Sequence, residues 1–276
     1  MFDHRKLGRE LGISDTDPLI GAGLPYWLPD GAAVRYALES YIRETERRAG
    51  YQHVYSPVLA KRELYEISGH WSHYQDDMFP VLPGSGDELV LRPSICPQHA
   101  LLYRSRSHSY RELPLRMAEL GGQYRAERSG VLGGLTRVRG MQLNDAHIFC
   151  TLDQVAGEAA AALSMIRSAY QAMGIEVLRY RLSLGSPGGK PGGKPGGKYV
   201  DDPAMWERAT AMLTDVLERA GADYQAEEGE AAFYGPKIDI QVADHADRAA
   251  GGFVPGAGSG FPDHRAGERA QGQLVG

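Results

Sequence analysis

One stretch of the chain, residues 113–150, restricts the possible folds more than any other. An apolar run leads into Arg125-x-Glu127, a glycine-rich segment follows, and a second strand-like run begins after Arg137 and Arg139. Two extended runs separated by glycines are typical of antiparallel strands joined by a loop. We therefore predict a hairpin that brings several arginines and one acidic residue together.

The cations of this hairpin suit the binding of a polyphosphate. Guanidinium is permanently charged and forks onto phosphate oxygens, which a site needs if it must neutralise a nucleotide while another group attacks the α-phosphate. The competing interpretation is a hairpin with a solvated charged face. That interpretation is the better one for any single arginine, whereas the whole set favours a pocket for a triphosphate and a small polar substrate.

Apolar periodicity predicts helices and strands along the rest of the chain. Residues 32–49 place Val34, Leu38 and Tyr41 on one side of an amphipathic helix. A short helix over 96–105 has proline at its first turn, where a missing N–H costs nothing. The other predicted elements are helices over 152–173 and 202–220 and strands over 51–58, 175–184, 224–225 and 237–242.

The composition favours one large globular domain and argues against a basic nucleic-acid-binding protein. The chain has 276 residues, 42% apolar content and a formal net charge of -5, so RNA binding would need a local patch. Candidates for that patch are Arg104, Arg106, Arg111 and Arg116, although a solvent-facing helix and loop is the simpler explanation. Without a hydrophobic leader or a long apolar run, the chain is expected to be cytoplasmic and to have no membrane partner.

Spaced motifs run from the first residues to about residue 248. They are Asp3-His4-Arg5-Lys6, Gly69-His70-Trp71, Met78-Phe79, Arg92-Pro93, Cys96-Pro97, His99, Tyr110-Arg111, residues 113–119, Arg125-x-Glu127, Arg137-x-Arg139-Gly140, residues 145–150, Gly229-Glu230 and residues 232–239. A series of this kind is far less prone to chance than one short pattern. Residues 1–248 therefore resemble the catalytic core of the threonyl-tRNA synthetases, which are class II aminoacyl-tRNA synthetases.

The resemblance implies an α+β fold with a mixed, mainly antiparallel sheet flanked by helices, here incomplete at the C-terminus. It implies a reaction in which threonine attacks the α-phosphate of ATP to give threonyl-adenylate, and the threonyl group then passes to threonine tRNA. ATP would act with Mg²⁺, and Zn²⁺ would help to select threonine. The helix over 32–49 and the strand after it would form a homodimer interface, with an ordinary surface helix as the competing interpretation.

Three positions of the hairpin take roles in ATP binding from the resemblance. Arg125 corresponds to the catalytic arginine on the α-phosphate, Glu127 to the residue that reads the adenine amino group, and Arg137 to a cation near the outer phosphates. Fixed cations of this kind stabilise the charge that spreads over the oxygens of a pentacovalent phosphorus.

Other positions take roles in threonine and zinc binding from the resemblance. Asp145 would accept a hydrogen bond from the threonine hydroxyl, and Tyr234 and Lys237 belong to the substrate-binding segment. Cys96 and His147 match two of the three zinc ligands, and the third ligand is not found. Zinc with an open position would take the amino and hydroxyl groups of threonine together, which valine cannot match. Considered alone, Cys96 is a buried thiol and His147 a core histidine.

Two segments depart from this core. Residues 187–198 repeat Pro-Gly-Gly-Lys three times and are predicted to form a flexible surface loop. Residues 249–276 contain eight glycines in twenty-eight residues without apolar periodicity, so we expect a disordered, out-of-frame or degenerate tail in place of the end of the catalytic domain. The arginine-bearing motif 3 is not found, and editing and anticodon-reading domains are expected to be missing.

Two functional classes remain open at this point. The first is an ATP-dependent threonine activator. The second is a catalytically inactive synthetase relic or paralogue that dimerises or binds ligand. Met141 and Leu143 stand where the family commonly has an aromatic residue and a glutamine, and leucine cannot hydrogen-bond an ammonium group.

Overall fold

The computed structural model describes residues 3–83, 86–185, 199–243, 249–255, 257–258 and 273–275, and from residue 243 onward only the backbone is described. The predicted repeat loop at 187–198 lies outside these residues. The chain divides into two compact units. Unit 1 comprises residues 1–106 and 117–146, and unit 2 comprises residues 107–116 and 147–276.

Unit 1 is built from short helices and short strands. Its elements are α1 (His4–Glu10), β1 (Ser14–Asp15), β2 (Tyr26–Trp27), α2 (Pro29–Arg48), β3 (Gln52–His53), β4 (Leu59–Lys61), α3 (Arg62–Ile67), α4 (His70–Tyr74), η1 (Gln75–Asp77), β5 (Leu82–Pro83), β6 (Glu88–Leu91), α5 (Cys96–Arg104) and η3 (Ser129–Val131). β1 pairs with β2, and β6 lies between β4 and β5, all antiparallel. β3 pairs in parallel with β7 (Leu115–Tyr124), which contributes residues to both units.

The predicted strand over 51–58 is regular only at β3 (Gln52–His53). Beyond it, Val54 N still donates to Ala118 O at 3.0 Å, but the carbonyls of Ser56 and Pro57 accept instead from the side chain of Arg92, at 3.2 and 3.5 Å. Proline cannot donate to a ladder, and these carbonyls already serve a buried guanidinium. The strand therefore ends early, because a tertiary partner takes the place of a strand neighbour.

Helix α2 buries few of its own side chains. Only Gly31 and Glu46 are buried among its residues, while Val34 is 50% and Leu38 45% exposed. Gly31 is needed where it stands, because a Cβ there would lie 1.8 Å from the carbonyl oxygen of Ile13. The apolar side that the sequence predicts for this helix is thus largely open to solvent.

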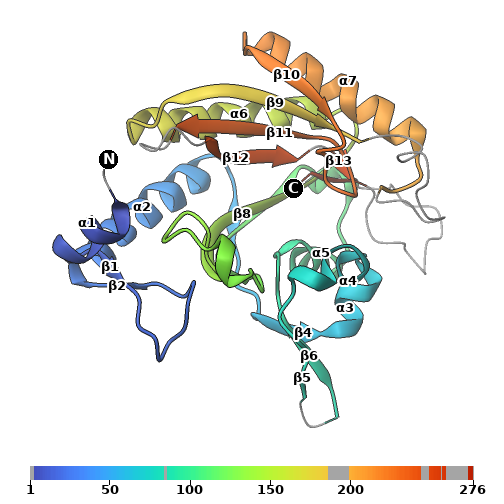
Figure 1. Ribbon diagram of the computed structural model, residues 1–276. Coiled ribbons are helices and arrows are strands. Elements are labelled where there is room, and N and C mark those ends of the chain that lie inside the picture. Colours follow the sequence, from blue (N-terminus) through green and yellow to red (C-terminus); the bar gives the residue numbers. More distant parts are fainter. Residues whose placement is uncertain are drawn as a thin grey trace. The chain divides into compact units, whose positions relative to one another are not determined.

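Unit 2 contains a four-stranded sheet with two long helices. Its elements are η2 (Tyr110–Glu112), α6 (Val155–Ala172), β9 (Val177–Leu184), α7 (Pro203–Arg219), β10 (Tyr224–Glu228), β11 (Lys237–Ala243), β12 (Ala249–Pro255), β13 (Ala257–Gly258) and β14 (Gln273–Val275), together with the end of β8 (Gly140–Cys150). The sheet order is β10-β9-β11-β12, with β10 parallel to β9 and the other pairs antiparallel. The predicted mixed, mainly antiparallel sheet flanked by helices is confirmed (Figure 1).

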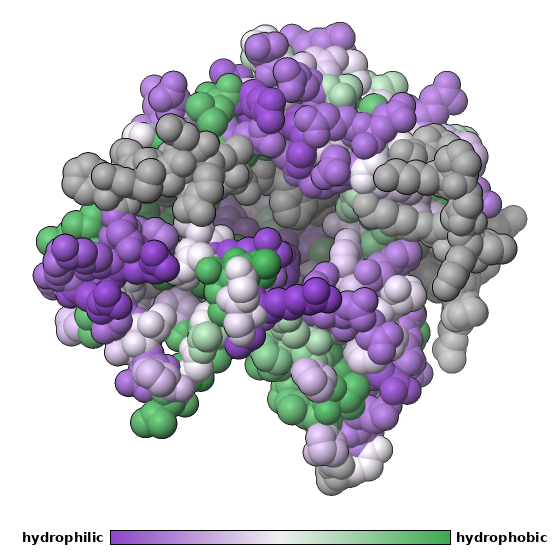
Figure 2. All heavy atoms as spheres, viewed as in Figure 1, coloured by the Kyte–Doolittle hydropathy of each residue, from purple (hydrophilic) through white to green (hydrophobic). Residues whose placement is uncertain are grey.

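The two faces of this sheet differ sharply in polarity. Leu182 of β9 and Ile238 and Ile240 of β11 pack with Leu163 of α6 and Leu213 of α7 in one buried apolar cluster. Because successive side chains alternate between faces, the residues between them form a polar face on the other side. Figure 2 shows mainly hydrophilic residues on the surface in the region of α7 and β10.

The glycine-rich segment includes strands that its sequence did not lead us to expect. β12 pairs with β11 from Ala243↔Ala249 to Lys237↔Pro255, and β14 pairs with β8. The expectation of an irregular tail over 249–276 is wrong for the residues of β12 and β14, which form paired strands. Backbone N–H and C=O groups at an open sheet edge can pair with any extended neighbour, whatever its side-chain period. A domain boundary at residue 248 stays a prediction.

Candidate active site

The loop after β7 presents the first predicted site residue. Arg125 follows the last residue of β7, and its backbone N–H donates to Arg139 O at 2.9 Å. Its side chain is exposed, and no acceptor among the described residues meets its guanidinium group. Strands β7 and β8 are neighbours in one sheet, as the predicted hairpin requires. The fold thus fixes the backbone of Arg125 and leaves its charged group open to solvent.

The other two predicted ATP-binding residues form an ion pair in the same loop. Arg137 approaches Glu127 Oε2 with Nη2 at 2.9 Å and Nε at 3.1 Å. Arg139 is used differently, since its Nε donates to Glu127 O at 2.8 Å. Arg137 keeps a 55% exposed side chain, whereas that of Glu127 is 16% exposed. The structure therefore brings Glu127 and Arg137 together and uses Arg139 to shape the loop.

Residues far away in sequence hold this loop. Leu135 N donates to His4 Nε2 at 3.1 Å, and Gly134 has a φ of 62° beside that imidazole. A Cβ at Gly134 would lie 2.2 Å from His4 Nε2, so glycine is needed for both reasons. Gly23 O accepts from Arg139 N at 2.7 Å. His4 belongs to a motif noted in the sequence. The position of that motif did not indicate that His4 would hold this loop.

Cys96 and Asp145 lie near each other in unit 1. Cys96 is half-buried at the first position of α5, and burial together with the negative charge of Asp145 raises the pKa of its thiol. Asp145 on β8 accepts a hydrogen bond from Gln123 Nε2 at 2.9 Å. Two of the predicted substrate and metal positions are thus brought together, with Gln123 as a supporting residue that the sequence did not indicate.

Beneath the start of α5 lies a buried ionic network. Arg92 donates to Glu119 Oε1 at 2.9 Å and to Gly122 O at 2.6 Å, and the two side chains are 1% and 3% exposed. Glu119 Oε2 accepts from Ser56 Oγ at 2.6 Å and lies 3.3 Å from His99 Nε2. His99, one turn after Cys96, therefore belongs to this network. The network connects four segments around the strand that leads to Arg125.

Burial and hydrogen bonding oppose each other at Glu119. Burial alone would raise the pKa of this carboxyl, but the donors His99, Ser56 and Arg92 and the charge of Arg92 outweigh it and lower the pKa to about 2. Gly121 must be small here, because a Cβ would lie 2.6 Å from Arg92 Nη2. The motifs Arg92-Pro93 and residues 113–119 contain both partners, but their spacing gave no sign of the ion pair.

Unit 2 carries the remaining predicted residues. His147 is fully buried on β8. Tyr234 is half-buried, with its ring 4.9 Å from that of Phe233 in an edge-on arrangement. Phe233 O accepts from Val200 N at 2.9 Å, which ties this segment to the start of α7. Lys237 is the first residue of β11. Convergence of these residues with those of unit 1 stays a prediction.

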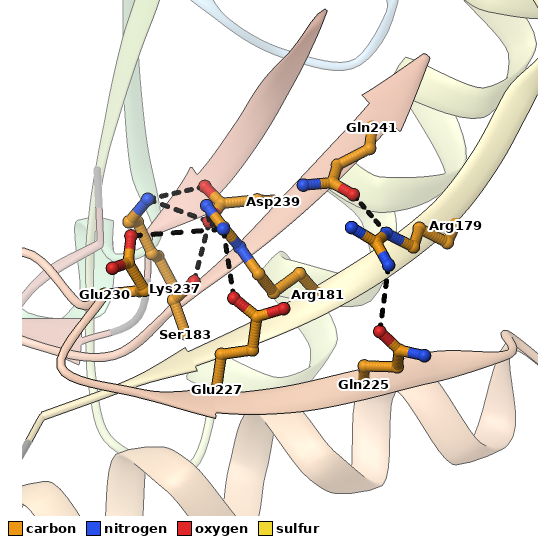
Figure 3. A network of polar contacts seen from close by, with 9 residues as sticks. All are labelled: Arg179, Arg181, Ser183, Gln225, Glu227, Glu230, Lys237, Asp239 and Gln241. Atoms are coloured by element: carbon orange, nitrogen blue, oxygen red, sulfur yellow. Dashed lines mark hydrogen bonds and ion pairs between the residues drawn. The ribbon is translucent and has the colours of Figure 1, made fainter. Parts of the chain in front are cut away.

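Lys237 belongs to a polar network on the sheet of unit 2 (Figure 3). Its Nζ lies 2.6 Å from Asp239 Oδ1 and 2.9 Å from Oδ2. Asp239 Oδ2 also accepts from Arg181 Nη2 at 2.8 Å and from Ser183 Oγ at 2.7 Å. Burial would lower the pKa of Arg181, but Asp239 and Glu227 raise it above its ordinary value.

The described residues do not supply a complete metal site. Within the ranges that the structure describes, no group of three or more His, Cys, Asp or Glu side chains is arranged to hold a metal ion. Cys96 and His147 would provide two donors, and a catalytic zinc site needs three protein ligands. Within the described part of the chain, these two donors therefore do not fit a zinc ion by themselves.

Comparison with known proteins decides the family. A family model for the tRNA synthetase class II core domain (G, H, P, S and T) matches residues 81–264. The chain belongs to the class II tRNA synthetase core family. This class II core is 51% identical over 240 residues to threonine–tRNA ligase of Halalkalibacterium halodurans and 52% identical over 241 residues to that of Streptococcus pyogenes serotype M5. Each alignment covers 87% of this chain and 36% of the relative. The chain thus spans about a third of the length of these threonine–tRNA ligases and corresponds to part of a threonyl-tRNA synthetase core.

Solved structures agree with this assignment of the class II core. The crystal structure described as the RNA binding domain of threonyl-tRNA synthetase from Cryptosporidium parvum Iowa II superposes with a TM-score of 0.83 at 34% identity, covering 92% of this chain and 61% of that one. A putative threonyl-tRNA synthetase from Aeropyrum pernix superposes with a TM-score of 0.79 at 28% identity, covering 94% and 60%. The helices in the described part of the class II core lack the length and apolar character of a membrane span.

Proposed function

We propose that this class II core activates threonine with ATP to give threonyl-adenylate and passes the threonyl group to threonine tRNA. One observation carries the proposal: the exposed guanidinium of Arg125 stands in the same short loop as the Glu127–Arg137 ion pair. A loop with a fixed backbone and open cations suits a triphosphate, since such cations need little reorganisation when charge develops on phosphate oxygens.

Three residues of unit 1 would each contact a different part of ATP. Arg125 would contact the α-phosphate, Arg137 the outer phosphates and Glu127 the adenine amino group. Arg137 and Glu127 hold each other in the structure, with Arg137 55% exposed, and ion pairs of this exposure are worth roughly 0–1 kcal/mol. ATP would therefore separate them at little cost and give each charge a partner on the nucleotide. Mg²⁺ would accompany ATP and neutralise further phosphate charge.

Recognition of threonine would depend on a hydroxyl acceptor. Asp145, held by Gln123 at 2.9 Å, would accept a hydrogen bond from the threonine hydroxyl. A site built to bond a hydroxyl rejects an analogue without one, because the hydrogen bond to the acceptor is then not made. Tyr234 and Lys237 would complete the substrate side. Cys96 and His147 are proposed zinc ligands, but two donors are too few for any step to be assigned to the metal.

The test is threonine-dependent exchange of pyrophosphate into ATP by the full chain. We expect exchange above background with threonine and much less with valine. Arg125→Gln should reduce the exchange rate by about 10²–10³-fold, the cost of losing one donor to transition-state charge. Arg128→Gln is the matched control, since Arg128 is an exposed arginine of the same loop outside the matched motif. Background exchange by the unaltered chain would contradict the proposal and favour the inactive paralogue.

A homodimer and a cytoplasmic location complete the proposal. The exposed apolar side chains of α2, including Val34 at 50% and Leu38 at 45%, support a contact with a second copy. Sedimentation of the purified chain should give the mass of a dimer, and Val34→Glu with Leu38→Glu should give a monomer. A monomeric unaltered chain would refute this part.

Binding of threonine tRNA is tested separately by the salt dependence of its affinity.

A further inference from the structure

Strand register places four polar side chains on one face of the unit 2 sheet. Arg181 of β9 stands opposite Asp239 of β11, and Ser183 stands opposite Lys237. Side chains two residues apart on a strand share a face, so Lys237 and Asp239 point the same way (Figure 3). The opposite face holds Ile238 and Ile240 in the apolar cluster. The position of this polar group is therefore fixed by a well-packed sheet.

Asp239 is the centre of the group. It is 8% exposed and accepts from Lys237 Nζ, from Ser183 Oγ and from two nitrogens of Arg181, at distances between 2.6 and 3.1 Å. A buried carboxylate needs such donors to remain charged. Arg181 and Ser183 approach Oδ2, so they fix the carboxylate, while Lys237 spans both oxygens. Glu227 and Glu230 reach Arg181 Nη1 at 3.2 and 3.9 Å.

We propose that Asp239 is the positioning residue for Lys237, and that Arg181 and Ser183 hold Asp239 for this purpose. The inference rests on the proposed function, because the substrate-binding role of Lys237 comes from there. Lysine has a long flexible stem, and fixing it costs side-chain conformational entropy. A lysine that is already held by a fixed carboxylate loses this entropy on folding and not on substrate binding. The substrate therefore binds to an ordered ammonium group.

The first experiment measures the order of Lys237 without any substrate. The chain has six lysines, so the signals of ¹³Cε-labelled lysine can be resolved by NMR, and Lys237→Arg identifies the signal. We expect the Cε of Lys237 to be more rigid than those of Lys6 and Lys61, whose side chains are 70% and 59% exposed. Asp239→Asn should lower its order parameter to their level. Glu227→Gln, which alters another carboxylate on Arg181, should leave it unchanged.

The second experiment asks whether this order serves binding. Calorimetry with a sulfamoyl analogue of threonyl-adenylate gives the affinity of the unaltered chain, Asp239→Asn, Lys237→Met and the double variant. We expect Asp239→Asn to weaken binding about tenfold, roughly 1.4 kcal/mol. In the Lys237→Met background the same change should have no further effect, because Asp239 acts through Lys237. Ser183→Ala, which removes one hydrogen bond, should weaken binding by a smaller factor and serves if Asp239→Asn does not fold.

Each outcome has a distinct meaning. A Lys237 signal as mobile as that of Lys6, or one insensitive to Asp239→Asn, would overturn the positioning role. Additive effects of Asp239→Asn and Lys237→Met on affinity would also overturn it, since Asp239 would then act independently. Failure of the unaltered chain to bind the analogue would instead count against the proposed function, and the NMR measurement would still decide whether Asp239 orders Lys237.

Discussion

Two buried carboxylates of unit 1, Glu119 and Glu46, have pKa values shifted in opposite directions. Both side chains are nearly inaccessible, at 3% and 0% exposure. Glu119 accepts from Arg92 and Ser56 and lies beside His99, and its pKa falls to about 2. For Glu46, burial dominates and raises the pKa. The number and charge of the donors, rather than burial, therefore decide whether a buried acid stabilises this fold.

The partners of Glu46 explain its weaker position. Asn144 donates one uncharged hydrogen bond to Glu46 Oε1 at 2.8 Å, and His53 Nε2 lies 3.1 Å from Oε2. Burial and the charge of Arg43 lower the pKa of His53, which favours a neutral imidazole. Glu46 thus accepts one hydrogen bond from a neutral amide, and the charge of Arg43 acts on it without a hydrogen bond, whereas Glu119 accepts directly from a guanidinium. Substitution of these carboxylates and of a partly exposed one, Glu158, tests this contrast.

The largest expected effect is that of Glu119→Gln. Removing this charge leaves Arg92, 1% exposed, as an uncompensated buried cation, which costs about 3–5 kcal/mol. Urea unfolding of the full chain measures the loss. Glu44→Gln is the control, since Glu44 pairs with Arg47 and Arg48 at the surface and should leave the free energy of unfolding unchanged. A loss equal to that of the control would refute a stabilising role for the network.

The same carboxylate predicts how stability depends on pH. The pKa of Glu119 lies at about 2 in the folded chain against an ordinary value of 4.5. Its stabilisation is therefore complete above pH 4.5 and is lost as the pH falls towards 2. Unfolding curves between these pH values should show this loss, and the difference between Glu119→Gln and the unaltered chain should shrink over the same interval. A constant difference would assign the loss to packing instead.

A smaller effect is expected at a partly exposed pair in unit 2. Arg116 Nε and Nη2 each lie 2.6 Å from an oxygen of Glu158, with 26% and 10% of the two side chains exposed. Hydrogen bonds to charged groups are worth about 1.5–3 kcal/mol, so Glu158→Gln should cost about that much. Asp215→Asn, at an exposed pair with Arg219, is the matched control. If Glu158→Gln lowered the free energy of unfolding as much as Glu119→Gln, the size of the loss would not depend on how deeply the cation is buried.

The smallest effect, with the opposite sign, is expected for Glu46→Gln. Burial penalises the charged form of Glu46, and glutamine keeps an oxygen for Asn144 without that charge. At pH 7 the substitution should raise the free energy of unfolding slightly, because it removes the desolvation cost of a buried charge. The gain should vanish at lower pH as Glu46 takes up a proton. Destabilisation comparable to Glu119→Gln would show that the two carboxylates are equivalent after all.

Much of the fold could be predicted from local sequence patterns. The helices expected over 152–173 and 202–220 appear as α6 and α7, and the strand expected over 237–242 appears as β11, because each has a strong apolar period and clear end signals. The strand over 51–58 was overestimated, since Arg92 competes for its carbonyls. Strand β12 was missed, because edge pairing leaves no apolar period in the sequence.

The candidate site was predicted unevenly. Arg125, Glu127 and Arg137 were predicted to come together in one hairpin, and the structure pairs the last two of them. Their roles in ATP binding stay predictions. Gln123, Asp239 and Arg181 were not singled out, because a buried glutamine or an ion pair in a strand has no local signal. The joint placement of Cys96, His147, Tyr234 and Lys237 stays a prediction.

The sequence by itself determined the family, the strongly periodic elements and the grouping of Arg125, Glu127 and Arg137, since these depend on spacing along the chain. Only the tertiary structure decided that Glu119 accepts from a guanidinium and that burial dominates at Glu46. Ser56 lies 63 residues from Glu119, and Asn144 lies 98 residues from Glu46. Donors reach a buried acid through folding rather than through proximity in sequence, so the charge balance at each site exists only once the segments have packed together.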